Sequence, residues 1–265
     1  MSLQFWLRIP PSWRILTRVS IDLRRGLDYH ESMRDKIRAA ATDLFIRDGL
    51  ADLTLASIAD RLGISRPSIH YHYRTRTVLA EEVLEGYAHV NLDHSRAIWL
   101  DPKVTLAQKF EGSLEFARQR YLRFNPSGEG DKPWNLFARF YQEGERMSPK
   151  MVQTLKNAAS QQQTYFRVAV DMAVVRGELE AHAPTGDIAL QITALVNQTG
   201  WLTWSGSSFA PVEQLYRAIL RSLELAYGVR GAGGAAFDPA PQTVLPKEPP
   251  HRRTAPRVAV RATGT

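Results

Sequence analysis

The sequence of 265 residues predicts an all-α protein. Apolar residues recur three and four positions apart along most of the chain, which is the spacing of one helix face. No stretch alternates apolar and polar residues with the period of two that is typical of strands, so no strand is predicted. Proline and glycine residues divide the periodic stretches into helices of ordinary length.

Composition and charge limit the classes of protein. The chain has no cysteine, which excludes disulfides and thiolate metal sites and agrees with a reducing cytoplasm. The formal net charge is +7, and residues 1–30 and 231–265 each hold five Lys or Arg against two acidic residues. The body between them is therefore nearly neutral, so attraction to a polyanion must come from a local patch of positive charge. The basic ends could add to this attraction.

The first predicted helix begins after Ser32, which has Asp35 as its capping-box partner, and ends at Gly49. Its apolar residues are spaced to pack on the next two helices. A later helix over residues 76–99 is long enough to leave this unit and to enter a second body of helices. We expect it to act as a lever between the two.

Two short helices lie between these longer ones and are joined by a tight turn. Thr54 is a good N-cap for the first, and Gly63 stands where the chain needs a positive φ. Ser65 caps the second, Pro67 lies in its first turn, and Ile69 is its only aliphatic residue and must face inward. The other side chains of this helix are polar or aromatic and are expected to face outward: Arg66, Ser68, His70, Tyr71 and His72.

This arrangement predicts a helix-turn-helix whose second helix lies in the DNA major groove. Residues 66–76 contain three arginines and no carboxylate, so their surface carries uncompensated positive charge. Thr75 caps the following helix, and its free N–H groups with Arg76 form a place for a phosphate. A plain pair of antiparallel helices in a bundle is the alternative, but it does not require so many exposed rings beside arginines.

Residues 34–79 resemble the DNA-binding domain of the TetR family of bacterial transcriptional regulators. The segments that carry the resemblance are AATDLFIRDG (40–49), TLASIADRLGIS (54–65), SIHYHY (68–73) and RTRTVL (74–79). The resemblance implies phosphate contacts by Thr54, Tyr71, Tyr73 and Arg76, and positions at or near base edges for Arg66, Pro67, Ser68 and His72. His70 stands where a tyrosine is common and Pro67 where glycine is more common, which affects the bases that are read.

The rest of the body is predicted to consist of further helices over residues 105–124, 133–146, 149–176, 187–204 and 211–227. The last two carry broad apolar stripes. The resemblance implies that they pair with those of a second copy in a four-helix interface, which the stripes allow. The alternative is that both stripes face the core of the same chain: Ile188, Ile192, Leu195, Thr199 and Leu202 on one helix, and Leu215, Ile219, Leu223 and Ala226 on the other.

The middle helices are where we expect a small molecule to bind. Aromatic and amide side chains there could line an apolar pocket, although aromatic residues at helical spacing are more often plain core. Their character predicts a neutral or cationic, fairly hydrophobic effector. The candidates are Trp134, Phe137, Tyr141, Tyr165, Phe166, Asn197 and Trp201, with Gln162 and Gln198 as further polar contacts.

The two ends differ from the body. Residues 1–30 do not match the family pattern. They are expected to be a flexible arm, or sequence upstream of a true start codon at Met33. Their tryptophans and arginines also allow an amphipathic membrane-surface segment. Residues 230–265 are rich in Pro, Ala and Gly and are predicted to be disordered. We therefore expect four parts: an extension (1–30), a DNA-binding domain (31–80), an effector-binding and dimerisation domain (81–229) and a tail (230–265).

Enzymatic motifs are lacking in the sequence. It has no Gly-x-Ser-x-Gly elbow, phosphate-cradling loop or His-Glu-x-x-His, and His89 and His94 lie on different helix faces, so neither catalysis nor a bound metal or cofactor is predicted. The sequence predicts a cytoplasmic, homodimeric DNA-binding regulator, most simply a repressor released from an inverted-repeat operator by a small hydrophobic effector. The alternative is a helical scaffold or a peripheral membrane protein that uses residues 1–30.

Overall fold

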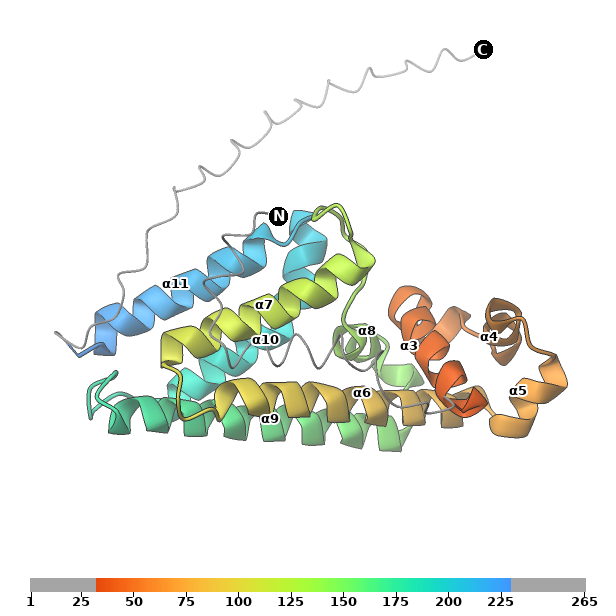
Figure 1. Cartoon of the computed structure of the whole chain (residues 1–265), viewed down its shortest axis with the longest axis horizontal. Coiled ribbons are helices and arrows are strands. Elements are labelled where there is room, and N and C mark those ends of the chain that lie inside the picture. Colours follow the sequence, from red (N-terminus) through yellow and green to blue (C-terminus); the bar gives the residue numbers. More distant parts are fainter. Residues whose placement is uncertain (1–31, 230–265) are drawn as a thin grey trace, which may run out of the picture. The chain divides into compact units, whose positions relative to one another are not determined.

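The computed structural model describes residues 32–229, and within this range the chain is helical apart from turns, loops and two isolated β-bridges (Figure 1). The all-α prediction is confirmed. The predictions for residues 1–30 and 230–265 lie outside the described residues. The helices are α3 (Met33–Asp52), α4 (Leu55–Leu62), α5 (Arg66–His72), α6 (Arg76–Trp99), α7 (Leu106–Phe124), α8 (Leu136–Gln142), the 3-10 turn η1 (Gly144–Arg146), α9 (Pro149–Val175), α10 (Thr185–Gly206) and α11 (Ala210–Tyr227).

Local capping sets the boundaries of the first three helices. Ser32 and Asp35 form a capping box at α3, and Thr54 forms another with Ser57 at α4. Gly63 ends α4 with a φ of 64°, and Ser65 accepts a hydrogen bond from the backbone N–H of Ser68 at the start of α5. The two-helix turn predicted from the sequence is therefore present.

The helix α3 differs from the prediction at its end. Gly49 has φ 78° and ψ −171°, which interrupts the helix as expected, but the chain resumes helical geometry and continues to Asp52. The side chain of Glu143, the residue that follows α8, caps the resumed turn. Such a cap comes from a residue far along the chain and therefore leaves no local signal.

A single core links these helices to the rest of the described chain. Phe45 of α3 meets Phe140 of α8 edge to face, with ring centroids 5.6 Å apart. The long helix α6 packs against α3 near its start and runs beside α9 (Figure 1). At its end, the buried Lys109 donates hydrogen bonds from Nζ to the carbonyls of Trp99 (2.9 Å) and Asp101. The helix α6, which the sequence predicted to act as a lever, is thus held by contacts within the chain at both of its ends.

The predicted helix over residues 133–146 is shorter than expected. Asn135 caps α8, because its Oδ1 accepts from the backbone N–H of Phe137 at 3.0 Å, so the helix begins at Leu136. It ends at Gln142, and a short 3-10 turn follows from Gly144.

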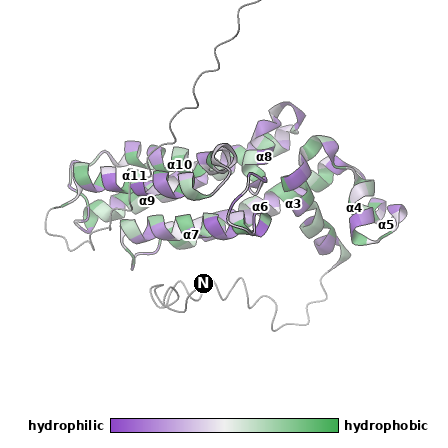
Figure 2. Ribbon diagram, turned by 90° about the horizontal axis from the view of Figure 1, so that it is seen from above, coloured by the Kyte–Doolittle hydropathy of each residue, from purple (hydrophilic) through white to green (hydrophobic). Residues whose placement is uncertain are grey.

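The apolar stripes expected to pair between subunits largely face this chain's own core. Ile188, Ile192 and Leu195 of α10 and Leu223 of α11 are buried within the described chain. Gly200 of α10 also lies against this chain, next to Ala138 of α8. Both helices are nevertheless amphipathic with apolar positions on more than one side (Figure 2). The large apolar side chains that they expose are Leu190, Trp201, Trp204 and Leu225.

No helix between residues 32 and 229 combines the length and the apolar character needed to cross a membrane.

Candidate DNA-binding helix and ligand cavity

The helix α5 presents its polar and aromatic side to solvent and is anchored by one buried aliphatic residue. Ile69 is fully buried, whereas the side chain of Tyr71 is 86% exposed. The rings of Tyr71 and His72 meet edge to face, with centroids 5.2 Å apart. A large aromatic side chain on this surface is poorly explained by packing within the chain. Its exposure leaves it available to a partner.

The nine predicted DNA-contacting residues fall into three groups by exposure. Five are exposed: Thr54 at the start of α4, and Arg66, Pro67, His70 and Tyr71 on α5. Three are half-buried, namely Ser68, His72 and Arg76, and Tyr73 is buried. The hydroxyl of Thr54 accepts from the backbone N–H of Ser57 at 3.1 Å, which is its capping role.

Tyr73 and Arg76 hold helices together. The Tyr73 hydroxyl donates to Glu82 Oε2 at 3.0 Å, and the Arg34 guanidinium lies 5.0 Å from the Tyr73 ring centroid. Burial, reinforced by the adjacent Glu82 carboxylate, raises the pKa of Tyr73 to about 12. Arg76 donates from Nη1 to the carbonyls of Ala51 and of Leu53, each at 3.1 Å. The structure thus engages both side chains within the chain.

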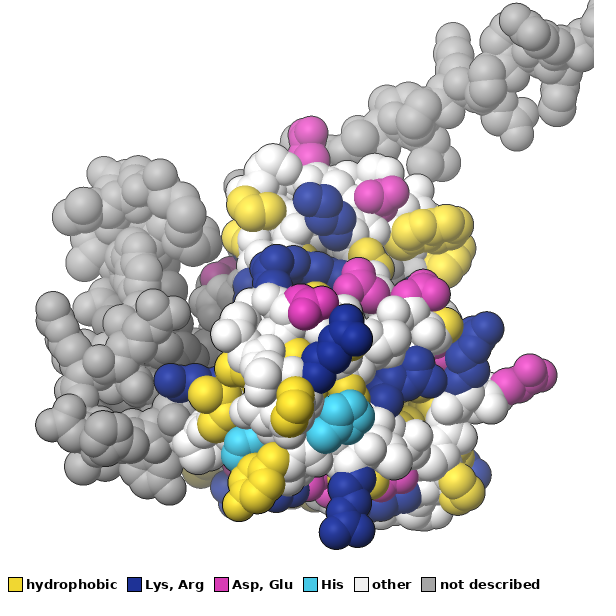
Figure 3. All heavy atoms as spheres, turned by 90° about the vertical axis from the view of Figure 1, so that its right-hand side faces the viewer, with side chains coloured by type: hydrophobic (Ala, Val, Ile, Leu, Met, Phe, Trp, Pro, Cys, Tyr) yellow, Lys and Arg dark blue, Asp and Glu magenta, His cyan; other side chains and the backbone are white. Residues whose placement is uncertain are grey.

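The face that carries α4 and α5 displays histidines, exposed apolar groups and several Lys or Arg side chains, with Asp and Glu side chains also present on the face (Figure 3). Arg66 and Arg74 are exposed there, and residues 66–76 contribute no acid. This charge pattern attracts a polyanion without specifying a sequence. The residues near the N-terminal end of α5 are the ones that a helix in the major groove brings to base edges.

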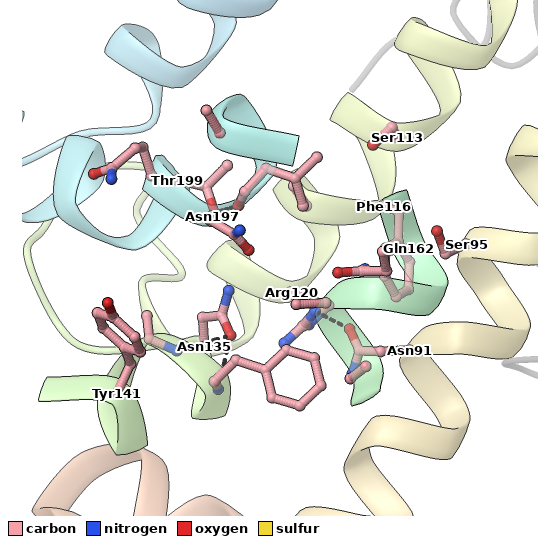
Figure 4. Close-up of a pocket in the computed structure, with 18 of the residues that line it drawn as sticks. Asn91, Ser95, Ser113, Phe116, Arg120, Asn135, Tyr141, Gln162, Asn197 and Thr199 are labelled. Carbon is pink, nitrogen blue, oxygen red and sulfur yellow. Dashed lines mark hydrogen bonds between the residues drawn. The ribbon is translucent and has the colours of Figure 1, made fainter. Parts of the chain in front are cut away.

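A second feature is a cavity of about 530 Å³ in the helical body. It is lined by residues of α6, α7, α8, α9 and α10, with Tyr216 from α11, and its size falls in the range of sites for small organic ligands. Figure 4 shows amide, hydroxyl and aromatic side chains from several helices directed toward the same space.

Six of the seven predicted effector residues line this cavity, and Tyr165 does not. Trp134 is 2% exposed, and its Nε1 donates to Thr203 Oγ1 at 2.8 Å, which fixes the indole. Tyr141 and Trp201 are 80% and 54% exposed and therefore lie at the opening. The other three are Phe137, Phe166 and Asn197.

The sequence prediction missed Arg120, which also lines the cavity. Its Nη1 donates to Asn91 Oδ1 at 2.6 Å (Figure 4). Its guanidinium carbon lies 4.8 Å from the ring centroid of Tyr87. A usable signal was present, because Ser113, Ala117 and Arg120 share one helix face with apolar neighbours. A cation on such a face points to a buried role.

The helix α8 and the residue that follows it join the cavity to the end of α3. Phe137 and Tyr141 line the cavity, whereas Arg139 and Glu143 contact the end of α3. Arg139 Nη2 donates to the carbonyl of Asp48 at 3.0 Å, and Glu143 accepts from the N–H of Leu50. Arg139 and Glu143 each follow a cavity-lining residue by two positions, so both sets of residues share the same short segment of the chain.

Among residues 32–229, no three His, Cys, Asp or Glu side chains come together in a way that could hold a metal ion.

An exposed second helix in a helix-turn-helix, with cations beside it, defines a DNA-binding protein. Residues 37–83 match the family model described as bacterial regulatory proteins, tetR family. The resemblance of this segment to the TetR family, inferred from the sequence, is confirmed over residues 37–83. A comparison with curated proteins found no match.

Solved structures share the fold of the described chain. A regulatory protein TetR from Rhodobacter sphaeroides has a TM-score of 0.62 and 14% identity, covering 72% of this chain and 98% of that one. Reduced NemR from E. coli has a TM-score of 0.61 and 14% identity, covering 75% and 98%. A putative transcriptional regulator from Saccharomonospora viridis, solved in complex with choline, has a TM-score of 0.58 and 18% identity, covering 74% and 98%.

Proposed function

We propose that the protein is a homodimeric repressor that binds an inverted-repeat operator and leaves it when a small effector enters the cavity. Residues 31–80 would read DNA, and residues 81–229 would bind the effector and the second subunit. The observation that carries the proposal is that α8 lines a ligand-sized cavity and also contacts α3, which packs against the helix-turn-helix. The S. viridis relative, solved with choline, supports small-molecule binding by proteins of this fold.

In this proposal α5 enters the major groove. Arg66, Pro67 and Ser68 at its N-terminal end reach base edges, and Tyr71 and His72 stabilise the approach to the backbone. Tyr73 and Arg76 contribute mainly by fixing α5 against α6 and α3, since their polar atoms already have partners.

Dimerisation would use the exposed side of α10. Leu190, Ala194, Asn197, Trp201 and Trp204 are exposed and recur at helical spacing along this helix. A row of exposed leucine and tryptophan is costly in water and is relieved when a second copy covers it. A two-fold pair also matches a palindromic operator, whose half-sites need two reading helices about one DNA turn, roughly 34–36 Å, apart.

Effector binding would alter the spacing of the two recognition helices through α6 and α8. A ligand shifts this equilibrium only through its different affinities for the two states, so DNA and effector must weaken each other reciprocally. The contacts of Arg139 and Glu143 with α3 are the elements through which movement of α8 would displace the DNA-binding helices.

The test is selection of bound sequences from random duplex DNA by the full-length protein at two salt concentrations. Enrichment of an inverted repeat that survives the higher salt supports a dimeric, base-reading regulator. Binding without enrichment that disappears as salt rises would show only non-specific attraction and would overturn the proposal. The enriched operator then serves in a reporter assay, where lower expression in the presence of the protein distinguishes repression from activation.

A further inference from the structure

The lining of the cavity has an unbalanced charge. Two of its residues, Arg120 and Lys156, are cationic, and none is an aspartate or a glutamate. Lys156 is exposed, whereas the Nη2 atom of Arg120 is buried. Among residues 32–229, no carboxylate forms an ion pair with Arg120, although buried arginines ordinarily have one.

Arg120 is held in place but is not neutralised. Nη1 is bonded to Asn91 Oδ1, and the Asn91 amide nitrogen donates in turn to the Tyr87 carbonyl at 2.8 Å. The rings of Tyr87, Phe116 and Trp134 have centroids 4.8, 5.4 and 5.7 Å from the guanidinium carbon. Nη2 has no hydrogen-bond partner. Burial, followed by the charge of Arg123, lowers the pKa of Arg120 to about 9, so the side chain is still a cation at neutral pH.

A second polar group on the same cavity also lacks a partner. The hydroxyl of Ser95 is buried and unpaired, and Ser95 lies one turn beyond Asn91 on α6. Residues four apart on a helix are neighbours on one face, so Ser95 adjoins the Asn91–Arg120 pair. Figure 4 shows Asn91, Ser95 and Arg120 in the same region of the cavity, with Gln162 among them. Unpaired buried polar atoms are rare, and two on one cavity point to a missing acceptor.

We propose that the effector of this cavity is a hydrophobic organic acid, whose carboxylate accepts hydrogen bonds from Arg120 Nη2 and the Ser95 hydroxyl. Its apolar body lies against aromatic side chains of the lining such as Phe137 and Phe166. This inference rests on the proposed function and names its ligand class. It reverses the charge expected from the sequence, where the aromatic residues alone favoured a neutral or cationic ligand.

Two donors suit a two-oxygen carboxylate better than a phosphate, which presents three or more oxygens to a site. The hydrogen bond to Asn91 sets the orientation of the guanidinium before the ligand arrives, so little ordering cost remains. Lys156 at the exposed side adds an attractive field for anions.

The test uses the full-length protein without DNA and a panel matched in shape. Aryl and alkyl carboxylates, such as 2-naphthoate and decanoate, are compared with their neutral amides and with ammonium ions of the same body. Binding is measured by calorimetry and by the rise in Tm. The carboxylates are expected to bind, with the amides roughly 10- to 100-fold weaker and the ammonium ions not detected. Preference for the amides or the ammonium ions, or no binding by any member, would overturn the inference.

Two variants test where the carboxylate of the ligand binds. Arg120→Gln keeps a polar side chain beside Asn91 but removes the charge, and it should erase most of the preference for acids over amides. Arg123→Gln is the matched control, since Arg123 is exposed on the same helix, pairs with Asp43 and does not line the cavity. Equal carboxylate affinity in wild type and Arg120→Gln would refute the assignment. Should Arg120→Gln not fold, Ser95→Ala is expected to weaken carboxylates several-fold more than amides, and equal weakening of both would refute it.

Operator release is measured separately from ligand binding. An acid that binds the free protein but leaves operator affinity unchanged would contradict the proposed release mechanism. It would still agree with the assignment of organic acids as ligands of the cavity. Release by neutral or cationic compounds only would contradict the assignment of an organic acid as the effector. It would still agree with the proposed function as a ligand-responsive regulator.

Discussion

The carboxylate of Glu143 accepts hydrogen bonds from the backbone N–H of Leu50, with its two oxygens 3.1 and 3.0 Å from the nitrogen. Oε2 also accepts from the N–H of Ala51 at 3.2 Å. Glu143 is 8% exposed and has Arg139 Nε at 3.4 Å from Oε1. A carboxylate that follows the cavity-lining α8 thus serves as the cap for the last turn of α3.

Replacing Glu143 should destabilise the protein and weaken its response to ligand. Glu143→Ala leaves the buried N–H of Leu50 unpaired, which costs about 1–3 kcal/mol of the free energy of unfolding. Denaturant unfolding measures this loss. Glu145→Ala, which alters an exposed residue of η1, is the control and should change little. Equal stability of the two variants would contradict the role of Glu143.

Gly49 is expected to tolerate no side chain. Its φ is 78°, and a Cβ placed there would lie 1.9 Å from Glu143 Oε1, so Gly49→Ala combines backbone strain with displacement of the cap. The expected loss is about 1–3 kcal/mol of stability. Gly86→Ala in α6 meets no neighbouring atom and should be neutral or stabilising by about 0.5–1 kcal/mol. Thermal unfolding of the two variants side by side is the measurement, and an equal Tm would refute the expectation.

Tyr71 should matter for DNA and not for folding. Its side chain is 86% exposed, so Tyr71→Ala is expected to keep the wild-type Tm while operator affinity falls by roughly 1–3 kcal/mol. Tyr141→Ala removes an equally exposed ring from the helical body and should keep operator affinity. Fluorescence anisotropy with the selected operator is the readout. A folded Tyr71→Ala variant with unchanged affinity would exclude Tyr71 from the interface.

The dimer face is tested with a charge. Trp204→Glu places a carboxylate on the exposed apolar row of α10, and sedimentation velocity should show a shift from dimer to monomer with weaker operator binding. Val175→Glu introduces the same charge at an exposed valine of α9 and should stay dimeric. A dimer that persists in Trp204→Glu would place the interface elsewhere.

The half-buried His94 predicts a loss of stability in mild acid. It stacks on Phe116 with ring centroids 4.7 Å apart, and burial lowers its pKa from 6.5 despite the opposing charge of Asp93. The unfolded chain therefore binds the proton more tightly, so the stabilisation is present above pH 6.5 and is lost as pH falls below it. The free energy of unfolding between about pH 7.5 and about pH 5.5 should fall more for wild type than for His94→Gln. Parallel curves would refute this.

Features with a local physical cause were predicted well. Thr54, Gly63 and Ser65 mark the turn before α5 because capping and positive φ depend on neighbours in the sequence. The aromatic residues around the cavity were largely predicted as well, because rings at helical spacing indicate an interior surface. Tyr165, which shares that spacing, lies outside the lining and shows that spacing alone does not define a cavity.

What the sequence could not supply are the partners of residues far apart in the chain. The helix α10 carries two apolar surfaces, the buried stripe of Ile188 and Ile192 and the exposed row of Leu190 and Trp204. Only the packing of neighbouring helices decides which of the two is buried. Arg120 depends on Asn91, which lies on another helix. Such pairs follow from tertiary structure.

The cavity opens beside the exposed row of α10, since Asn197 and Trp201 belong to both. A second copy docked on that row would narrow the opening of the cavity that these two residues flank. Effector exchange would then be slower in the dimer than in the separated protomers, so dissociation of the ligand would accelerate on dilution of the protein. A cell holding few copies would respond faster to a falling effector level than one holding many.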